Sequence, residues 1–259
     1  MSFFKIRRNP GGAVNTHVVD VGWLLQTDHA SFIWDAPRPV KRRESPPAHA
    51  KSVAFCPAVI DSEIRFFEVD CPFDLRLRIG LDDKGEPTLT DLAGDGSTMT
   101  PRSLGQIVVL SARRQWRHPD KPIIQFKTPY TFVADEPVYL NQLPPFAYYK
   151  DPPLPGLVIG GRIPIHIWPR PLSWAFEWCD MQRDLILTRG QPWFYLRFET
   201  SDPTQHVRLV EAAVTPELKN YFAGINGVVN YVNGTFSLFG TAQQRRPERL
   251  LVKVQRKTR

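Results

Sequence analysis

Trp193-Phe-Tyr-Leu-Arg-Phe198 is the stretch that decides the fold class, because it would be apolar on both faces of an extended chain. Successive side chains of a strand point to opposite sides of the sheet, so a strand with two apolar faces is buried on both. Just before it, Ser173-Trp-Ala-Phe-Glu-Trp178 places three aromatic rings on one face. Both segments predict strands, and we expect residues 193–198 to form a central one.

The sequence on either side of this block also favours short strands. Residues 73–79 alternate apolar and polar side chains, which is typical of a strand with one buried face, and we expect them to pair with residues 63–69. Residues 157–168 form a strand-like run interrupted by the pair Gly160-Gly161, which predicts a bulge or a close approach of two backbones.

Proline and aromatic content support the same fold class. The chain of 259 residues has 25 prolines, and 12% of its residues are aromatic. Proline lacks a backbone donor and breaks helices, so this composition suits short strands joined by stiff turns. We count about ten to twelve strands, without internal repeats or alternating βαβ units. The sequence therefore predicts a mainly β protein, an antiparallel sandwich or jelly roll.

The C-terminal part differs from the rest. Thr215-Pro216-Glu217 combines an N-cap residue, a proline in the first helical position and an acidic first turn. Apolar residues then recur at steps of three and four, from Leu218 to Phe239, as on one face of a helix. We therefore predict one long helix over residues 216–240, although glycines within it weaken the helix or mark a break.

The basic charge is concentrated at the C-terminus. The formal net charge is +7, and residues 245–259 contain seven basic residues against Glu248 alone, which leaves only +1 for residues 1–244. We predict a single domain over residues 1–244, followed by a basic tail over residues 245–259. Such a tail is either a solvated terminus or an arm for nucleic acid or an acidic membrane. Binding of single-stranded nucleic acid requires basic and aromatic side chains interleaved on one face. Outside the tail, only residues 113–121 show this pattern, with Trp116 between arginines.

Cysteine usage and hydropathy point to a reducing compartment. Cys56, Cys71 and Cys179 form no CxxC pair. The first residues are too short an apolar run for a signal peptide, and no stretch is apolar enough for a membrane helix. We expect a cytoplasmic protein without a membrane span.

Three motifs lie within residues 161–198. They are Trp168-Pro, the aromatic strand 172–178 and residues 187–196, which contain Gly190-Gln-Pro192 before a second aromatic strand. Together they resemble a bacterial family that is known only as a domain of unknown function. Gly22-Trp23 matches a glycine-tryptophan pair near the N-terminus of that family. The resemblance implies a β domain, and it implies no activity and no catalytic residue.

The aromatic residues are the first candidate site. They either build a core or line an apolar pocket for a small molecule. The proline-rich stretch over residues 143–156 contains five prolines and three aromatics, and we expect it to form the rim or lid of such a pocket. The candidate pocket residues are Trp168, Trp174, Phe176, Trp178, Trp193 and Tyr195.

His118-Pro119-Asp120 is the second candidate site. Non-haem Fe(II) oxygenases on jelly-roll folds hold iron with a His-x-Asp pair and a distant histidine, for which His166 and His206 are candidates here. Against this hypothesis, the motif lies in a charged, proline-containing stretch that is typical of an exposed turn.

Three classes of function remain open from the sequence. A small-ligand-binding or accessory protein of bacterial specialised metabolism requires no catalytic motif and is favoured. A non-haem Fe(II) oxygenase is the enzymatic alternative. The third is an assembly protein, a homo-oligomer that uses the apolar helix and the basic tail.

Overall fold

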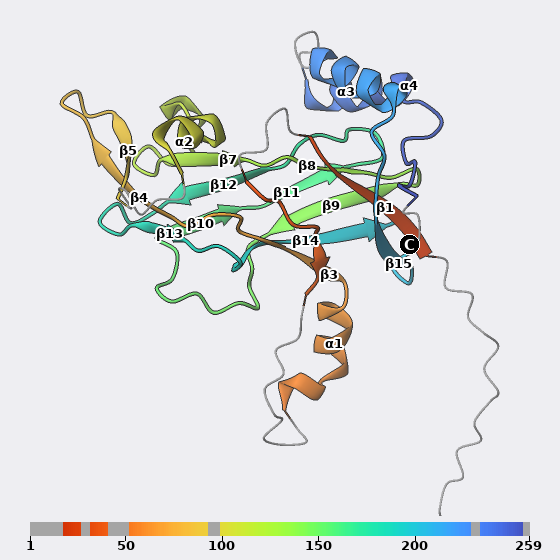
Figure 1. Cartoon of the computed structure of the whole chain (residues 1–259), viewed down its shortest axis with the longest axis horizontal. Coiled ribbons are helices and arrows are strands. Elements are labelled where there is room, and N and C mark those ends of the chain that lie inside the picture. The colour runs from red at the N-terminus through yellow and green to blue at the C-terminus, as the bar shows by residue number, and fades with distance from the viewer. Residues whose placement is uncertain (1–17, 27–31, 41–51, 93–98, 229–233, 256–259) are drawn as a thin grey trace, which may run out of the picture.

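The computed structural model describes residues 18–26, 32–40, 52–92, 99–228 and 234–255, in which short strands predominate (Figure 1). The strands that the structure describes form four sheets. The mainly β class is therefore confirmed. Nearly all strand pairs are antiparallel; β1 and β15 are parallel. The split into four small sheets differs from the two continuous layers of the predicted sandwich.

The five-stranded sheet contains the stretch that decided the fold class. Its order is β11 (Gly161–Pro164), β9 (Val138–Leu143), β14 (Pro192–Thr200), β3 (Phe66–Asp70) and β2 (Arg38–Pro39). Strand β14 lies in the middle, paired with β9 on one side and β3 on the other, as the two apolar faces predict.

The four-stranded sheet carries the other aromatic strand. Its order is β10 (Gly156–Ile159), β12 (Ser173–Trp178), β7 (Ile123–Lys127) and β6 (Val108–Leu110). Strands β10 and β11 come from the single run predicted over residues 157–168, but they belong to different sheets. The chain turns at Gly160, where a Cβ atom would lie 3.0 Å from the carbonyl oxygen of Gln142. The glycine pair therefore marks a change of sheet.

Two three-stranded sheets complete the β structure. One has the order β15 (His206–Glu211), β1 (Val18–Leu25) and β8 (Tyr130–Val133). The other has the order β13 (Leu185–Leu187), β4 (Leu75–Leu81) and β5 (Pro87–Asp91). The alternation predicted in β4 is confirmed, since Leu75, Leu77 and Ile79 are buried. Its predicted pairing with residues 63–69 is wrong, because β3 pairs with β14 and β2 instead.

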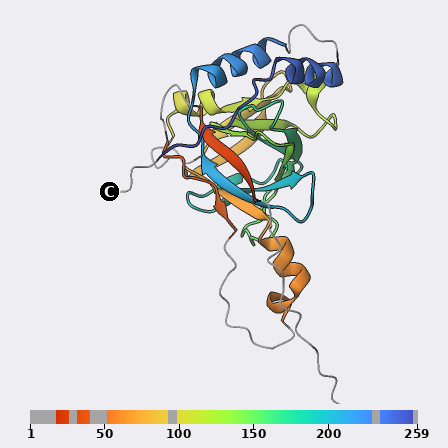
Figure 2. The ribbon, with the colours of Figure 1, turned by 90° about the vertical axis from the view of Figure 1, so that its right-hand side faces the viewer.

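Short helices lie around the sheets. They are α1 (Pro57–Glu63), α2 (Pro101–Ile107), α3 (Pro216–Val228) and α4 (Thr235–Arg245), with 3₁₀ turns at Val53–Phe55 and Arg113–Gln115. Figures 1 and 2 show α1 projecting from one side of the body, while α3 and α4 cover the opposite side.

The single helix predicted over residues 216–240 is wrong, because the structure has two helices there. Helix α3 ends at Val228 and α4 begins after its N-cap, Gly234. The Tyr221 hydroxyl of α3 lies 3.0 Å from the carbonyl oxygen of Ala242 in α4, so the two helices pack side by side. Each helix is amphipathic, so apolar residues recur at steps of three and four in both. In the sequence the two apolar faces therefore resemble the single stripe of one long helix. The start of the helix at Pro216, with the Thr215 hydroxyl accepting from the Leu218 N–H, is as predicted.

Two hydrophobic clusters form the interior. The larger one joins side chains from all four sheets, including Phe73, Phe126, Trp174 and Trp193, whose rings contact one another at centroid distances of 5.4–6.0 Å. The smaller cluster lies beneath α3 and includes Leu24, Leu218, Ile225 and Leu250. The apolar face of α3 is thus buried against the body of the same chain.

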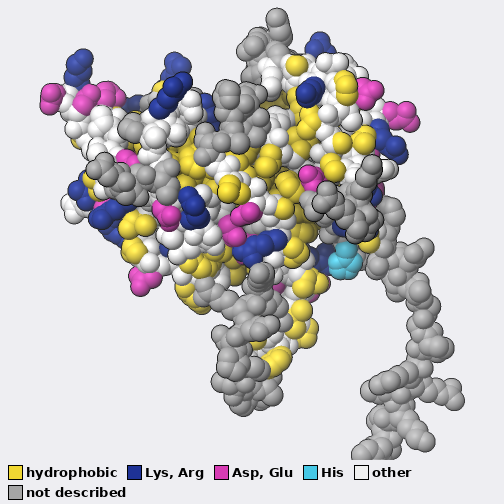
Figure 3. Space-filling view, viewed as in Figure 1, with side chains coloured by type: hydrophobic (Ala, Val, Ile, Leu, Met, Phe, Trp, Pro, Cys, Tyr) yellow, Lys and Arg dark blue, Asp and Glu magenta, His cyan; other side chains and the backbone are white. Residues whose placement is uncertain are grey.

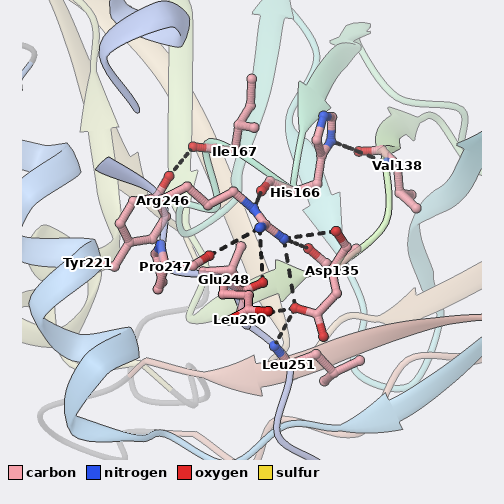
Figure 4. Close-up of polar contacts among 11 residues, drawn as sticks. Asp135, Val138, His166, Ile167, Tyr221, Arg246, Pro247, Glu248, Leu250 and Leu251 are labelled. Carbon is pink, nitrogen blue, oxygen red and sulfur yellow. Dashed lines mark hydrogen bonds and ion pairs between the residues drawn. The ribbon is translucent and has the colours of Figure 1, made fainter. Parts of the chain in front are cut away.

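The segment after α4 is packed onto the body and does not extend freely. Leu250 and Leu251 are buried, and Lys253 pairs with Asp20 and forms a β-bridge with Ala212. Figure 4 shows how Arg246 and Asp135 fasten this segment. Arg246 donates to main-chain carbonyl oxygens, and Asp135 accepts from the N–H groups of the two buried leucines. Much of the predicted basic tail is therefore structural.

Candidate functional site

The candidate aromatic residues separate into three places. Trp174, Phe176, Trp178 and Trp193 are buried in the main core, as the core interpretation predicted. Trp168 lies at the helical end, with its ring 5.3 Å from that of Phe239. Tyr195 points away from these core tryptophans, onto Phe66 and Phe146. The six residues do not line one pocket, but two of them, Trp174 and Trp193, line a small cavity with the proline-rich loop.

This cavity, hereafter the loop cavity, has a volume of about 20 Å³. It lies between the ends of several strands and the loop of residues 144–155 that joins β9 to β10. Its floor is aromatic, and its polar lining comes from Cys71, Lys150, Thr188 and Gln191. No acidic residue lines it among the residues that the structure describes. The volume admits a group of about one or two water-sized atoms.

Local backbone geometry positions the polar wall of the loop cavity. The turn before β14 reverses at Gly190, whose φ of 74° favours glycine. The Cys71 N–H donates to the Gln191 carbonyl oxygen, and the Gly190 N–H donates to the Cys71 carbonyl oxygen, both at 2.9 Å. This pair of bonds fixes the turn beside the end of β3. It thereby places the Gln191 side chain opposite the loop.

Lys150 supplies the positive charge of the loop cavity. The lysine is half-buried, and its Nζ lies 3.2 Å from Gln191 Oε1. Within the described ranges it makes no salt bridge with a carboxylate. Burial lowers the pKa of Lys150 below its usual value of 10.5, because the charged form loses hydration. The ammonium group therefore has a neutral partner where buried charges generally have a charged one.

The two tryptophans at the floor of the loop cavity carry indole donors without a partner. The Nε1 atoms of Trp174 and Trp193 are buried and have no hydrogen-bond partner among the described residues. Trp178 differs, since its Nε1–H donates to the carbonyl oxygens of Asp180 and Arg183 at 2.9 and 3.2 Å. A buried donor without an acceptor costs about 1–3 kcal/mol, so native structures normally satisfy it. Both Nε1 atoms are inaccessible even to water, so the two tryptophans contribute apolar surface to the loop cavity.

Cys71 is a weak donor in the loop cavity. Its thiol donates to the carbonyl oxygen of Phe73 at 3.2 Å. Burial raises the pKa of Cys71 to about 12, so the side chain is a neutral thiol at physiological pH. Because the thiolate is the reactive form of cysteine, the environment of Cys71 does not suit nucleophilic catalysis.

The proline-rich loop is fastened over the loop cavity at several points. The ring of Phe146 packs against Phe66 and Tyr195 at 5.0 and 5.3 Å. Arg183 donates from Nη2 to the carbonyl oxygen of Pro153 at 2.6 Å, and Pro155 accepts from the N–H of Cys179. These contacts hold the loop on the body on both sides of Lys150. The loop thus occupies the place of the predicted rim.

His118, Asp120 and His166 occupy different surroundings. His118 and Asp120 are exposed in a turn, where His118 Nδ1 accepts from the Asp120 main-chain N–H at 3.2 Å. His166 Nδ1 lies 2.9 Å from the carbonyl oxygen of Val138, and burial lowers the pKa of His166. In the described part of the chain, no group of three or more His, Cys, Asp or Glu side chains is placed to hold a metal ion. The exposed-turn interpretation of residues 118–120 therefore matches the structure.

Two other surface features carry less specific chemistry. A pocket of about 350 Å³ lies between α3 and α4 and is lined in part by Glu217, Tyr221 and Arg245. Its buried polar group, the Tyr221 hydroxyl, already donates to main-chain oxygens. The projecting α1 end shows hydrophobic side chains (Figure 3), with Val53 and Ile64 exposed. Within the described residues, no helix is both long and apolar enough to cross a membrane.

Sequence reasoning missed the polar half of the loop cavity. It identified Trp174, Trp193 and the loop, but not Lys150, Gln191 or Cys71. The sequence offers one indication of Lys150, because it is the only basic residue in the proline-rich stretch 143–156. Nothing in the sequence shows that Gln191 and Cys71, 120 positions apart, lie beside it.

Comparison with known proteins adds no constraint on function. The chain matches no family model and no curated protein sequence. Because one fold supports many activities, function must be argued from the site itself.

Proposed function

We propose that this protein binds a small molecule in the loop cavity, with Trp174 and Trp193 below it and the proline-rich loop above it. One observation carries the proposal. A half-buried lysine that has no carboxylate partner among the described residues lines a small cavity whose floor is formed by two buried tryptophans. A buried charge that lacks a charged partner, in a cavity with an aromatic floor, is typical of a binding site, because a ligand supplies the missing partner.

The size of the loop cavity defines what binding requires. A volume of about 20 Å³ holds about one water molecule, so a ligand would fill it with one small group and the rest would extend towards the loop. The loop is held by side-chain and main-chain contacts at Phe146, Pro153 and Pro155, and between these points Lys150 bonds to the side chain of Gln191. Local displacement of this stretch would widen the cavity without disturbing the sheets.

The geometry favours binding over iron-dependent oxidation. An oxygenase of the predicted type needs His118, Asp120 and a second histidine at one metal ion. In the structure His118 faces its own turn and His166 contacts Val138. The loop cavity, by contrast, contains a half-buried ammonium group that no carboxylate of the described residues neutralises.

A fragment screen read by nuclear magnetic resonance tests the proposal. Protein labelled with ¹⁵N in its seven tryptophans gives separate indole N–H signals, and Trp174→Phe and Trp193→Phe identify two of them. We expect fragments from a library of neutral, cationic and anionic compounds to shift both signals in a saturable way. The Trp178 signal is the internal control, because its N–H is already bonded within the protein. If no fragment of any charge shifts the Trp174 or Trp193 signal, the proposal is wrong.

A further inference from the structure

We infer that the pocket between α3 and α4 is a second binding site, and that its ligand is a free α-amino acid with an apolar side chain. This pocket, hereafter the helix groove, has a volume of about 350 Å³ and shares no lining residue with the loop cavity. The inference is therefore independent of the proposed function. It follows from two charged side chains at one end of the groove, from its apolar floor and from the free space at Gly224.

Two opposite charges line the same end of the helix groove. Glu217 lies in the first turn of α3, and Arg245 is the last residue of α4. The two helices follow each other closely in the sequence and touch at Tyr221 and Ala242, so they form a hairpin that brings these ends together. Both charged side chains are exposed, and among the described residues neither makes an ion pair or a side-chain hydrogen bond.

This arrangement of charge favours a ligand that carries both signs. Arg245 attracts an anion that Glu217 repels, and Glu217 attracts a cation that Arg245 repels, so a ligand with a single charge gains little. In an α-amino acid an ammonium and a carboxylate group are attached to one carbon atom. The ammonium group suits Glu217, and the carboxylate suits the guanidinium group of Arg245. Asn220, beside them, can donate to the carboxylate or accept from the ammonium group.

The rest of the helix groove suits an apolar side chain. Its floor is formed by Tyr221, Ile225 and Ala242, which are buried. Gly224 lies about one helical turn beyond Asn220, a rise of about 5.4 Å, and a Cβ atom on Gly224 would meet no atom within 4 Å. A side chain of the size of leucine that starts beside Asn220 would therefore extend over Gly224 and cover the apolar floor.

The volume of the helix groove agrees with a ligand of this size. Sites for small molecules typically have volumes of roughly 300–1,000 Å³. The value of about 350 Å³ lies at the lower end of this range, so the groove suits a molecule of a few heavy atoms. The open space at Gly224 shows that the side chains of this chain do not fill it.

Titration of the full-length protein with leucine tests the inference. Protein labelled with ¹⁵N in its glycines and tryptophans gives a Gly224 amide signal, which is identified by its absence in Gly224→Ala. We expect leucine to shift this signal in a saturable way. The indole signals of Trp174 and Trp193 report on the loop cavity and should not move, so the two sites are tested separately.

Three analogues of leucine test each part of the ligand. Leucinamide keeps the ammonium group and lacks the carboxylate, 4-methylpentanoate keeps the carboxylate and lacks the ammonium group, and glycine lacks the side chain. We expect the two singly charged analogues to bind roughly threefold or more weakly than leucine, a modest factor because Glu217 and Arg245 are exposed. Glycine should bind roughly tenfold more weakly, because it buries no apolar side chain.

Substitutions with matched controls locate the site. Glu217→Gln and Arg245→Gln should each weaken leucine binding by roughly threefold or more, whereas Lys219→Gln, at an exposed lysine of α3 outside the groove, should not change it.

Gly224→Leu should fill the groove and abolish binding. Gly240→Leu is its control, because Gly240 lies in α4, also meets no atom and does not line the groove. Saturation-transfer signals of leucine itself measure binding to all variants, and circular dichroism verifies that each is folded. If Gly224→Leu does not fold, the two variants at exposed charged residues decide.

Several results would overturn the inference. Binding of leucinamide or 4-methylpentanoate as tight as that of leucine would remove the need for two charges, and equal binding of glycine would remove the apolar floor. Unchanged leucine binding in folded Gly224→Leu, or in both charge variants, would place the site elsewhere. Tighter binding of leucylleucine, whose charges lie farther apart, would assign the groove to a peptide. Absence of a Gly224 shift up to the solubility limit of leucine would exclude the site, while the proposed function at the loop cavity would stand.

Discussion

Arg246 Nε lies 2.5 Å from the main-chain carbonyl oxygen of His166, a residue 80 positions earlier in the chain. The same guanidinium group donates to the carbonyl oxygen of Asp135 at 2.8 Å and to that of Pro247 at 3.1 Å. One arginine thus satisfies acceptors from the loop before β9, from the turn after β11 and from the C-terminal segment (Figure 4). The relationship shows that a residue of the apparent basic tail belongs to the folded body.

Replacement of Arg246 should destabilise the protein. Arg246→Ala removes a largely buried cation and leaves main-chain carbonyl oxygens without a donor, which should lower the free energy of unfolding by roughly 3 kcal/mol. Arg245→Ala, at the exposed neighbour in α4, should change it by less than about 0.5 kcal/mol. Urea unfolding followed by tryptophan fluorescence measures both. Equal stabilities of the two variants would contradict the structural role of Arg246.

Shortening the chain should separate the structural part of the C-terminus from the rest. A protein that ends at Val254 retains the buried Leu250 and Leu251 and the bridge at Lys253, and it should unfold at the wild-type urea concentration. A protein that ends at Arg245 loses two buried leucines and the donors to Asp135, so it should be destabilised by more than about 3 kcal/mol. Wild-type stability in the shorter protein would show that the segment is dispensable.

Glycine substitutions should have opposite effects at two positions. A Cβ atom on Gly22 would overlap Leu251 Cδ1 and lie 2.9 Å from the Val133 side chain, so Gly22→Ala should cost about 1–3 kcal/mol of stability. Gly22→Ala combined with Leu251→Ala should lose less than the sum of the single changes, because the second change relieves the overlap. Gly224→Ala in α3 meets no atom and should stabilise by about 0.5–1 kcal/mol. Destabilisation of similar size at both glycines would be inconsistent with this packing.

Alkaline pH should destabilise the protein through Cys71. The folded thiol has a pKa of about 12 against an ordinary 9.0, so between these values the unfolded chain has lost a proton that the folded chain retains. Stability therefore falls as pH rises, by up to about 1.4 kcal/mol per pH unit from this group. In Cys71→Ala the free energy of unfolding should fall less steeply over the same pH range. Urea unfolding repeated at increasing pH measures it. An unchanged slope would mean that Cys71 does not contribute.

The sequence predicted strands more reliably than their partners. Alternation and apolar runs identified β4, β12 and β14, and the two apolar faces of residues 193–198 correctly placed β14 in the middle of a sheet. Local pattern contains no information on long-range register, and the expected pairing of residues 63–69 with 73–79 was therefore wrong. The prediction of one long helix was wrong for a related reason. Helices α3 and α4 each have an apolar face, and the apolar periodicity of the sequence does not show where one helix ends and the next begins.

The candidate site was predictable only in its aromatic half. Aromatic strands and a proline-rich loop can be read locally, and two of the six candidate residues, Trp174 and Trp193, line the loop cavity. Lys150, Gln191 and Cys71 come together through the pairing of β3 with β14 and the closure of the loop, which no local pattern encodes. The charge at the C-terminus was interpreted from composition alone, and composition cannot show that Arg246 is buried.

Lys150 should lose its proton at a lower pH than an ordinary lysine. Burial lowers the pKa of Lys150 below 10.5, because the charged form loses hydration and its hydrogen-bond partner, Gln191, is neutral. A nuclear magnetic resonance titration at increasing pH measures this ionisation, and the signal of Lys150 is identified by its absence in Lys150→Met. Ionisation of Lys150 at or above pH 10.5 would show that the lysine is not buried beside Gln191.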